Sequence, residues 1–432
     1  RIIMFKGVLT VQCAGLGLEL LAMCPEFESL CGLRFAPLQP VFPAVTCTAQ
    51  ASFRSALPPS KHGVVCNGRY ERKSKRVEFW HQSADLVAGE RIWEGLRRNS
   101  GTAAMMFYQQ SLGENCDFLL SPAPIHRHHG GMVQACHSRP AELENELNRA
   151  IGKSFDLQYY WGPRAGRRSS QWICQAIKLL MSRHKPNFIA AYLPHMDYCQ
   201  QKYGPECRRR IYPELLLLAS WLKQLREHCE ELGYELLVWG DYAITPVRQA
   251  LFPNRLLRRQ GYFEARKVPS GRSYPNLYDS AAFAMCDHQV AHVYIQNPAD
   301  LAALQKLFQA QPGIARALPP QHFELPGPES GDLVLEAEPG YWFAYQWWEK
   351  NSEAPDYAAH VDIHNKIGFD PCELFWKIPF VSIHGDCSLP RGSHGRCDQA
   401  AAYAASPALA EQTQAHNLLE LSAKVKDVLN RI

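Results

Sequence analysis

Buried-type strands alternate with amphipathic helices along the first half of the chain, and this order limits the fold more than any other feature. Strand-like runs cover 7–13, 187–193 and 234–240, and a helical pattern over 213–232 separates the last two. A further helix is expected from Ser169 to about His184. Strand, helix and strand in this order favour parallel strands joined by crossover helices. The sequence therefore predicts an α/β protein with a mostly parallel central sheet flanked by helices.

Candidate site residues follow the ends of these strands. Ala14 follows the first strand, the segment "PHMD" ending at Asp197 follows the second, and Asp241 follows the third. In parallel sheets, ligands bind beyond the carboxyl ends of the strands. We therefore expect a ligand site at this edge, to which Thr46 also belongs.

Thr46 lies where a proline-rich extended segment becomes a helix. Pro40 and Pro43 exclude a helix before it, and the apolar spacing predicts a short helix from Cys47 to Ala56. Free N–H groups and the helix dipole at this end favour an anion. Two interpretations stay open from the local pattern: Thr46 caps the helix, or it faces an anionic ligand.

Composition excludes several functional classes. With 46 Lys and Arg against 42 Asp and Glu, the net charge of +4 is too small to indicate nucleic-acid binding. No apolar run reaches transmembrane length. The 15 cysteines lack the spacing of a zinc ribbon or a disulfide framework. We expect free thiols in a reducing, cytoplasmic compartment.

The sequence changes in character after residue 253. A basic, loop-rich stretch over 255–272 precedes strand-like runs at 291–296 and 331–337, with a helical pattern over 298–309 between them. This mixture is typical of a small α+β unit. We predict that residues 254–340 form a cap inserted into a core made of residues 1–253 and 341–432.

Several motifs resemble those of the alkaline phosphatase superfamily, in particular its nucleotide pyrophosphatase/phosphodiesterase branch. They are "PVFPAVTCTAQASF", "PPSKHGVVCNGRY", "YLPHMDYCQQKYGP", "VWGDYAITPV" and "GSHG". The resemblance implies an alkaline-phosphatase-like core that hydrolyses phosphoric esters. It also implies a nucleophile at Thr46, an amide donor to the phosphoryl oxygen at Asn67, and divalent metal ions that clamp the attacking and leaving oxygens.

Three of the six metal-ligand positions that the resemblance implies are replaced. The first-strand aspartate falls on Ala14, and two histidines fall on Gln201 and Tyr242. Ligand-type side chains are kept at the other three, Asp197, Asp241 and His394. An ordinary two-zinc site therefore does not match the sequence.

The segment "CDHQVAHVY" offers a replacement ligand. On a strand with period two, His288 and His292 share one face, and imidazole is a common metal ligand. The predicted set suits one or two ions of zinc or manganese and comprises Asp197, Asp241, His288 and His394. The alternative is that both histidines belong to an apolar core.

Arg164 in "YWGPRAG" is a candidate phosphate clamp, because a guanidinium donates two hydrogen bonds to an oxyanion. The alternative is an ordinary surface arginine.

The predicted function is metal-dependent hydrolysis of a phosphoric ester, of phosphodiesterase or pyrophosphatase type, on a phosphorylated small molecule. A non-catalytic protein that holds an anionic ligand on the same fold is the alternative. Thr46 and Asn67 favour the enzyme, whereas Ala14, Gln201 and Tyr242 favour the binding protein.

Overall fold

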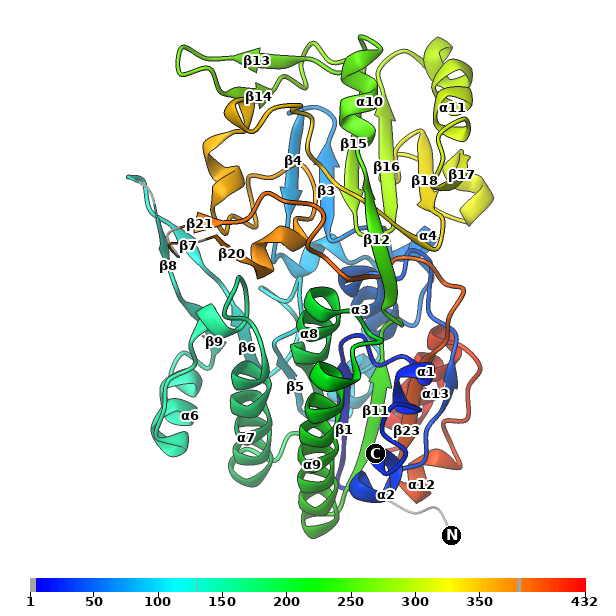
Figure 1. Cartoon of the computed structure of the whole chain (residues 1–432). Coiled ribbons are helices and arrows are strands. Elements are labelled where there is room, and N and C mark those ends of the chain that lie inside the picture. The colour runs from blue at the N-terminus through cyan, green and yellow to red at the C-terminus, as the bar shows by residue number, and fades with distance from the viewer. Residues whose placement is uncertain (1–4, 130, 378, 380–381) are drawn as a thin grey trace.

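The computed structural model describes residues 5–129, 131–377, 379 and 382–432. Figure 1 shows a large sheet in the lower half of the molecule and a smaller one above it. The large sheet has eight strands in the order β2-β23-β11-β1-β10-β5-β6-β9. Their bounds are β2 (Ala36–Leu38), β23 (Ala401–Ala405), β11 (Tyr234–Gly240), β1 (Gly7–Cys13), β10 (Phe188–Leu193), β5 (Ala103–Met106), β6 (Phe118–Pro122) and β9 (Cys136–Arg139).

The middle of this sheet is parallel. Strand β1 pairs in parallel with both β10 and β11, β10 with β5, and β5 with β6. Antiparallel strands β23, β2 and β9 complete the two edges. The predicted strands 7–13 and 234–240 coincide with β1 and β11, and β10 begins one residue inside its prediction. The mostly parallel α/β sheet is thus confirmed.

Helices cover both faces of the sheet. Helices α7 (Arg167–Arg183) and α9 (Arg208–Leu232) pack on β10 and β11 and lie in front of the sheet in Figure 1. Helices α3 (Thr46–Ser55) and α13 (Leu418–Leu429) pack together, and Phe53 of α3 stacks on Trp239 of β11 with ring centroids 4.5 Å apart. The strands between these layers are therefore buried on both faces.

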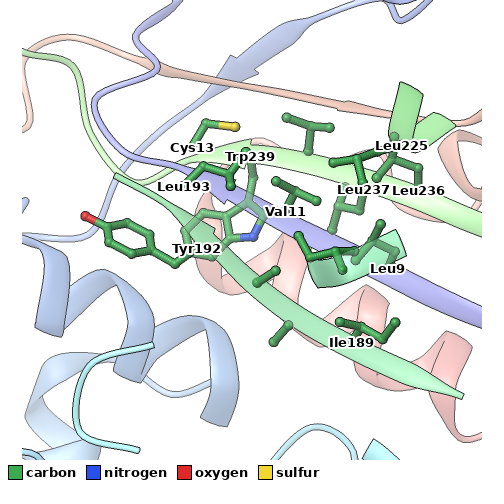
Figure 2. Packing of buried hydrophobic residues seen from close by; sticks show 14 of the residues in the cluster. Leu9, Val11, Cys13, Ile189, Tyr192, Leu193, Leu225, Leu236, Leu237 and Trp239 are labelled. Carbon is green, nitrogen blue, oxygen red and sulfur yellow. The ribbon is translucent and has the colours of Figure 1, made fainter. Parts of the chain in front are cut away.

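Figure 2 shows the resulting core, with Leu9, Val11 and Cys13 of β1 between side chains of its neighbours. All seven residues of β1 are buried. Burying one leucine fully stabilises the fold by about 2 kcal/mol. Thr10 and Gln12 are polar but equally buried, because neither face of β1 meets water, and their side chains donate to the Ile189 carbonyl and to Asp241.

The smaller sheet is antiparallel, in the order β15-β16-β18-β17. Its strands are β15 (Ala282–Asp287), β16 (Val290–Ile295), β18 (Leu333–Ala337) and β17 (Ile314–Leu318), accompanied by α10 (Pro253–Arg259) and α11 (Leu301–Gln309). Its hydrophobic core also includes Val65, Phe79, Phe343 and Trp347. These four residues lie outside 254–340, and the division into cap and core at those bounds stays a prediction.

All 15 cysteines are free thiols in the structure. In the part of the chain that the structure describes, every helix is too short or too polar to cross a membrane.

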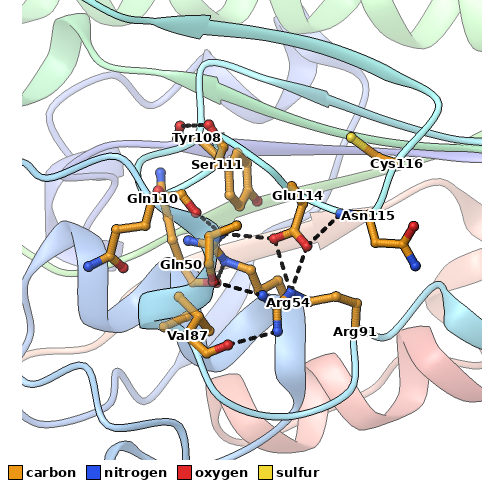
Figure 3. A network of polar contacts seen from close by, with 12 residues as sticks. Gln50, Arg54, Val87, Arg91, Tyr108, Gln110, Ser111, Glu114, Asn115 and Cys116 are labelled. Atoms are coloured by element: carbon orange, nitrogen blue, oxygen red, sulfur yellow. Dashed lines mark hydrogen bonds and ion pairs between the residues drawn. The ribbon is translucent and has the colours of Figure 1, made fainter. Parts of the chain in front are cut away.

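A buried ionic network fixes the C-terminal end of α3 (Figure 3). The Arg54 guanidinium is fully buried and donates to the carbonyl oxygens of Gln109 and Gln110 at 2.7 and 2.6 Å. Arg54 and Arg91 both pair with Glu114, at 3.2 and 2.9 Å. Because an unpaired buried charge is strongly destabilising, the network holds the last turn of α3 against the segment 109–114.

His62 makes a second buried contact with α3. Its Nδ1 accepts a hydrogen bond from the Val64 N–H at 3.1 Å, so its Nε2 carries the proton and donates to Ser52 Oγ at 2.8 Å. Burial, together with the charges of Arg54 and Arg91, lowers the pKa of His62 to about 3. The folded protein therefore holds this imidazole neutral.

Acid should destabilise the protein through His62. Its pKa is lower in the folded chain than in the unfolded chain, so between about pH 6.5 and pH 3 the unfolded chain binds the extra proton. This contribution to stability is present above about pH 6.5 and is lost as the pH falls, by about 2 kcal/mol at pH 5. Urea unfolding of wild type and His62→Gln, at about pH 6.5 and at pH 5, measures this loss of stability. An equal pH dependence in the two proteins would contradict the assignment.

Candidate active site

Three parallel strands and one helix bring the candidate residues together. Strands β1, β10 and β11 end side by side, and Ala14, the segment 194–197 and Asp241 follow them. Helix α3 starts at Thr46 and follows Val45, which has extended backbone. Val45 is thus the N-cap residue, and Thr46 is the first residue of the helix, so the hydroxyl of Thr46 is not used as a cap.

The Thr46 hydroxyl belongs to a buried chain of hydrogen bonds. Thr46 Oγ1 lies 3.0 Å from the Tyr242 hydroxyl, which donates to Asp197 Oδ1 at 3.2 Å. Since the single phenolic proton goes to Asp197, the Thr46 hydroxyl is the donor to Tyr242. The second oxygen of Asp197 accepts from Gln201 Nε2 at 2.6 Å. Burial raises the pKa of Asp197 to about 6, so this carboxyl group is mostly ionised at neutral pH.

Asp241 lies behind this chain and is fully buried. It accepts hydrogen bonds from Gln12 Nε2 at 2.6 Å, from the Gly15 N–H at 2.9 Å and from the Tyr242 N–H at 3.1 Å. Burial raises the pKa of Asp241 to about 7. These donors tie the ends of β1 and β11 together.

Two histidines stack beside Tyr242. The His394 ring lies on the Tyr242 ring with centroids 3.6 Å apart, and the His288 ring is 3.7 Å from that of His394. His394 Nδ1 donates to the Ala44 carbonyl at 2.8 Å, which directs its Nε2 lone pair towards Asp197 Oδ1, 3.6 Å away. Burial and the nearby His288 hold the pKa of His394 below its usual range.

His288 and His292 have different surroundings, although the sequence places them on one face of a strand. His288 lies in the turn between β15 and β16, where its Nδ1 contacts Asp287 at 2.7 Å. Its Nε2 has no hydrogen-bond partner among the described residues. His292 is buried, with both ring nitrogens near carbonyl oxygens, those of Ser330 and Val65. His292 is therefore a core histidine.

Asn67 lies against the start of α3. Its Oδ1 accepts from the Cys47 N–H at 3.0 Å, and its Nδ2 donates to Asp287 Oδ1 at 3.1 Å. The structure thus places Asn67 next to Thr46 along the helix end. An amide nitrogen has two hydrogens, and the contact with Asp287 uses one of them.

Arg164 is not brought to these residues. It is exposed, donates to Gln158 Oε1 at 2.9 Å, and lines a different surface pocket from Thr46. Arg164 is therefore not among the residues that line the cavity beside Thr46.

Several of the candidate residues line a small cavity of about 70 Å³, whereas Asn67 and Asp241 lie behind its described wall. Thr46, Asp197, Gln201, Tyr242, His288 and His394 all contribute to its wall. Aromatic rings form much of the remainder, among them Trp80, Tyr160, Trp161 and Phe369. Residues 341–348, "YWFAYQWW", are also rich in aromatic side chains but lie elsewhere, in the packing around β19 (Gly340–Phe343) and the second core.

The cavity wall also includes a buried ionic cluster that the sequence analysis does not predict. Lys366 Nζ contacts Asp370 at 2.8 Å and Glu373 at 2.6 Å, and all three line the cavity. Asp362 adds a further carboxylate to this wall, which also includes Asp197. The spacing of Lys366, Asp370 and Glu373, four and three residues apart, is the one signal that the sequence offers for such a cluster.

The side chains do not fit the pair of metal ions that the family resemblance implies. All four carboxylate oxygens of Asp197 and Asp241 already accept hydrogen bonds, and the donors include the replaced positions Gln201 and Tyr242. Ala14 offers no ligand atom. Within the described ranges, no three side chains of His, Cys, Asp or Glu converge as metal ligands do.

Comparison with known proteins gives a consistent picture. The profile of the family described as type I phosphodiesterase / nucleotide pyrophosphatase matches residues 8–370. No curated protein sequence matches the chain.

The fold recurs in solved structures of low sequence identity. Phosphonoacetate hydrolase from Sinorhizobium meliloti 1021, in complex with phosphonoformate, is 14% identical with a TM-score of 0.64. Murine ectonucleotide pyrophosphatase / phosphodiesterase 5 is 12% identical with a TM-score of 0.59. Its inactive threonine-to-alanine variant, in complex with AMP, is 11% identical with a TM-score of 0.60. Each alignment covers 98% of this chain and 95% of the other.

Proposed function

The chain belongs to the type I phosphodiesterase / nucleotide pyrophosphatase family, a family of phosphoric ester hydrolases, and we propose that it cleaves a phosphodiester with Thr46 as the nucleophile. The observation that carries this proposal is the hydrogen-bonded chain from Thr46 through Tyr242 to Asp197 at the cavity wall. The inactive threonine-to-alanine variant of the murine relative supports a threonine in this role.

In the proposed reaction, the Thr46 oxygen attacks phosphorus while its proton passes to the Tyr242 oxygen. The phenolic proton moves at the same time to Asp197, which acts as the general base. The bond from phosphorus to the leaving oxygen breaks with its electron pair, and that oxygen takes a proton from water. The hydroxide left by that water then attacks the phosphorus atom on Thr46, the bond from phosphorus to the threonine oxygen breaks, and the proton on Asp197 returns through Tyr242 to this oxygen.

The N-terminus of α3 supports the charge on the phosphoryl group. Thr46 is the first helical residue, so the positive end of the helix dipole lies beside its hydroxyl. We propose that the second amide hydrogen of Asn67 assists it, as the resemblance implies. A phosphoryl oxygen in this place would be held by dipoles and a neutral amide.

The charge of the cavity wall favours a diester over a monoester. Four carboxylates line the cavity together with one ammonium group, that of Lys366, which is already paired; they are those of Asp197, Asp362, Asp370 and Glu373. A phosphomonoester carries about two negative charges at neutral pH and is repelled more strongly than a diester with one. We therefore propose a monoanionic phosphodiester whose leaving group carries no negative charge.

We propose that these side chains catalyse the hydrolysis without the metal ions that the family resemblance implies. Elemental analysis should then find no stoichiometric zinc or manganese, and treatment with a chelator should leave hydrolysis of bis(para-nitrophenyl) phosphate unchanged. The combined variant Ala14→Asp, Gln201→His and Tyr242→His restores the ligand types that the resemblance implies. It should gain bound zinc and serves as the control.

The metal-free proposal would be wrong if wild type held one equivalent of zinc or manganese and His288→Ala lost both this ion and the activity. The ion predicted from the sequence would then be present. A site of Asp197, Asp241, His288 and His394 would then hold that ion.

The replaced ligand positions also support a second candidate, a binding protein that holds an anionic ester without cleaving it. A panel of phosphodiesters and pyrophosphates distinguishes the two functions. A diester that binds tightly but yields no product at any pH would favour the binding protein.

A further inference from the structure

A second, larger cavity lies away from Thr46. It has a volume of about 770 Å³ and is bordered by β12 (Thr245–Leu251), by helix α10 and by the segments 351–359 and 382–388. None of the residues that line the Thr46 cavity also lines it. Pockets of several hundred Å³ are the size that small-molecule ligands occupy.

Positive charge dominates the wall of this larger cavity. Arg248, Arg255, Arg272 and Lys377 line it, and Asp386 is the one carboxylate among its lining residues. None of these four cations forms an ion pair within the residues that the structure describes. Four cations gathered around one space repel each other, and an anion between them offsets this repulsion.

Arg255 differs from the two other arginines of α10 that have carboxylate partners. Arg258 pairs with Glu353 at 3.1 Å, and Arg259 pairs with Glu349 at 2.7 Å. Arg255, on the same short helix, has no such partner and faces the cavity instead. The carboxylates beside this helix thus pair directly with Arg258 and Arg259, whereas Glu349 acts on Arg255 only at longer range.

Neighbouring groups hold the Arg255 side chain in place. Its guanidinium lies over the Phe252 ring, 3.7 Å from the centroid, and donates to Gln346 Oε1 at 2.9 Å. Gln346 in turn donates to the carbonyl of Gly385 at 3.0 Å. The Nε of Arg255 is buried and has no acceptor in the described part of the chain. A positioned guanidinium with a free donor is suited to an oxyanion.

We propose that this cavity binds a small molecule with at least two linked phosphoryl groups. Guanidinium forks match phosphoryl oxygens in pairs, and several cations around one space favour a ligand with several negative charges. The hydroxyl-bearing residues Ser382 and Ser388 and the exposed Gln249 add polar groups to the same wall. This site is separate from the proposed hydrolase function and does not depend on it.

One segment of the chain lines both cavities. Residues 354–359 and 382–388 border the larger one, and residues 362–374 between them border the Thr46 cavity. A ligand in the larger cavity therefore contacts the ends of the segment that carries Lys366, Asp370 and Glu373.

The test is calorimetric titration of the full chain with inorganic pyrophosphate, with orthophosphate and citrate as comparison ligands. We expect saturable binding of one pyrophosphate per chain, at least about tenfold tighter than either comparison ligand. The double variant Arg248→Ala with Lys377→Ala removes two exposed cations and should weaken binding at least about tenfold while the fold is kept. Arg255→Gln should weaken it as well.

Two controls separate this site from others. Arg76→Ala removes an exposed arginine outside the cavity and should leave pyrophosphate binding unchanged. Thr46→Ala should also leave it unchanged, because Thr46 lines the other cavity. Absence of saturable binding, equal affinity for citrate, or full affinity in the Arg248 and Lys377 double variant would each overturn the proposal.

Discussion

Hydrolysis of an activated phosphodiester should fall by a factor on the order of 10³ to 10⁶ when Thr46 is replaced by alanine, as is usual when a nucleophile is removed. The substitution deletes the only atom proposed to attack phosphorus. The fold should be kept, because alanine suits the first turn of α3 and the Thr46 side chain makes no capping bond. Turnover of bis(para-nitrophenyl) phosphate, with thermal unfolding measured in parallel, checks both parts.

Thr48 provides the matched control. It lies two residues further along the same helix, is equally buried, and its hydroxyl has no hydrogen-bond partner among the described residues. Thr48→Ala should therefore keep wild-type turnover. Loss of activity in Thr48→Ala with activity kept in Thr46→Ala would show that the wrong hydroxyl has been assigned.

Tyr242→Phe should lower kcat by about 10² to 10⁴, the usual contribution of proton transfer by a positioned group. Phenylalanine keeps the ring that stacks on His394 at 3.6 Å but removes the oxygen between Thr46 and Asp197. KM should change little, since the phenol is proposed to move a proton and not to hold substrate.

The pH profile gives an independent check on the role of Tyr242. Burial raises the pKa of Asp197 to about 6, and the carboxylate form is the base, so wild-type kcat should rise as the pH increases through about 6. Tyr242→Phe should lose this limb, because Asp197 no longer reaches the nucleophile. Near-wild-type kcat in Tyr242→Phe, with the limb kept, would mean that Thr46 is activated by some other group.

Much of the fold followed from the sequence because its central strands are buried on both faces. Apolar runs such as "NFIAAYL" and "YELLVWG" are typical of strands buried in the middle of a sheet. Because these strands are parallel, their carboxyl ends lie at the same edge of the sheet. The positions of Asp197 and Asp241 followed from those ends. The side-chain directions did not, because they depend on neighbours hundreds of residues away. Tyr242 was identified as a lost ligand position, whereas its hydrogen bonds to Thr46 and Asp197 appear only in the structure.

Two further features, the pair of histidines and the second cavity, are not predicted by sequence patterns. The period of a strand placed His288 beside His292, but the strand is interrupted by a turn at His288, which separates their surroundings. The second cavity joins Arg248 and Arg255 to residues more than one hundred positions further along, such as Lys377 and Asp386. No local spacing predicts that meeting.

The central place of β1 has a consequence for how the chain is made. Its partners β10 and β11 end at Leu193 and Gly240, so one edge of β1 has no neighbour until residue 193 has been synthesised, and the other has none until residue 240. At about 5 to 20 residues per second, this delay is roughly 10 to 50 seconds. The segment "GVLTVQC" has unpaired backbone on both edges until β10 is available, and on one edge until β11 is available. The nascent chain should therefore depend on a chaperone that holds this strand until β11 emerges from the ribosome.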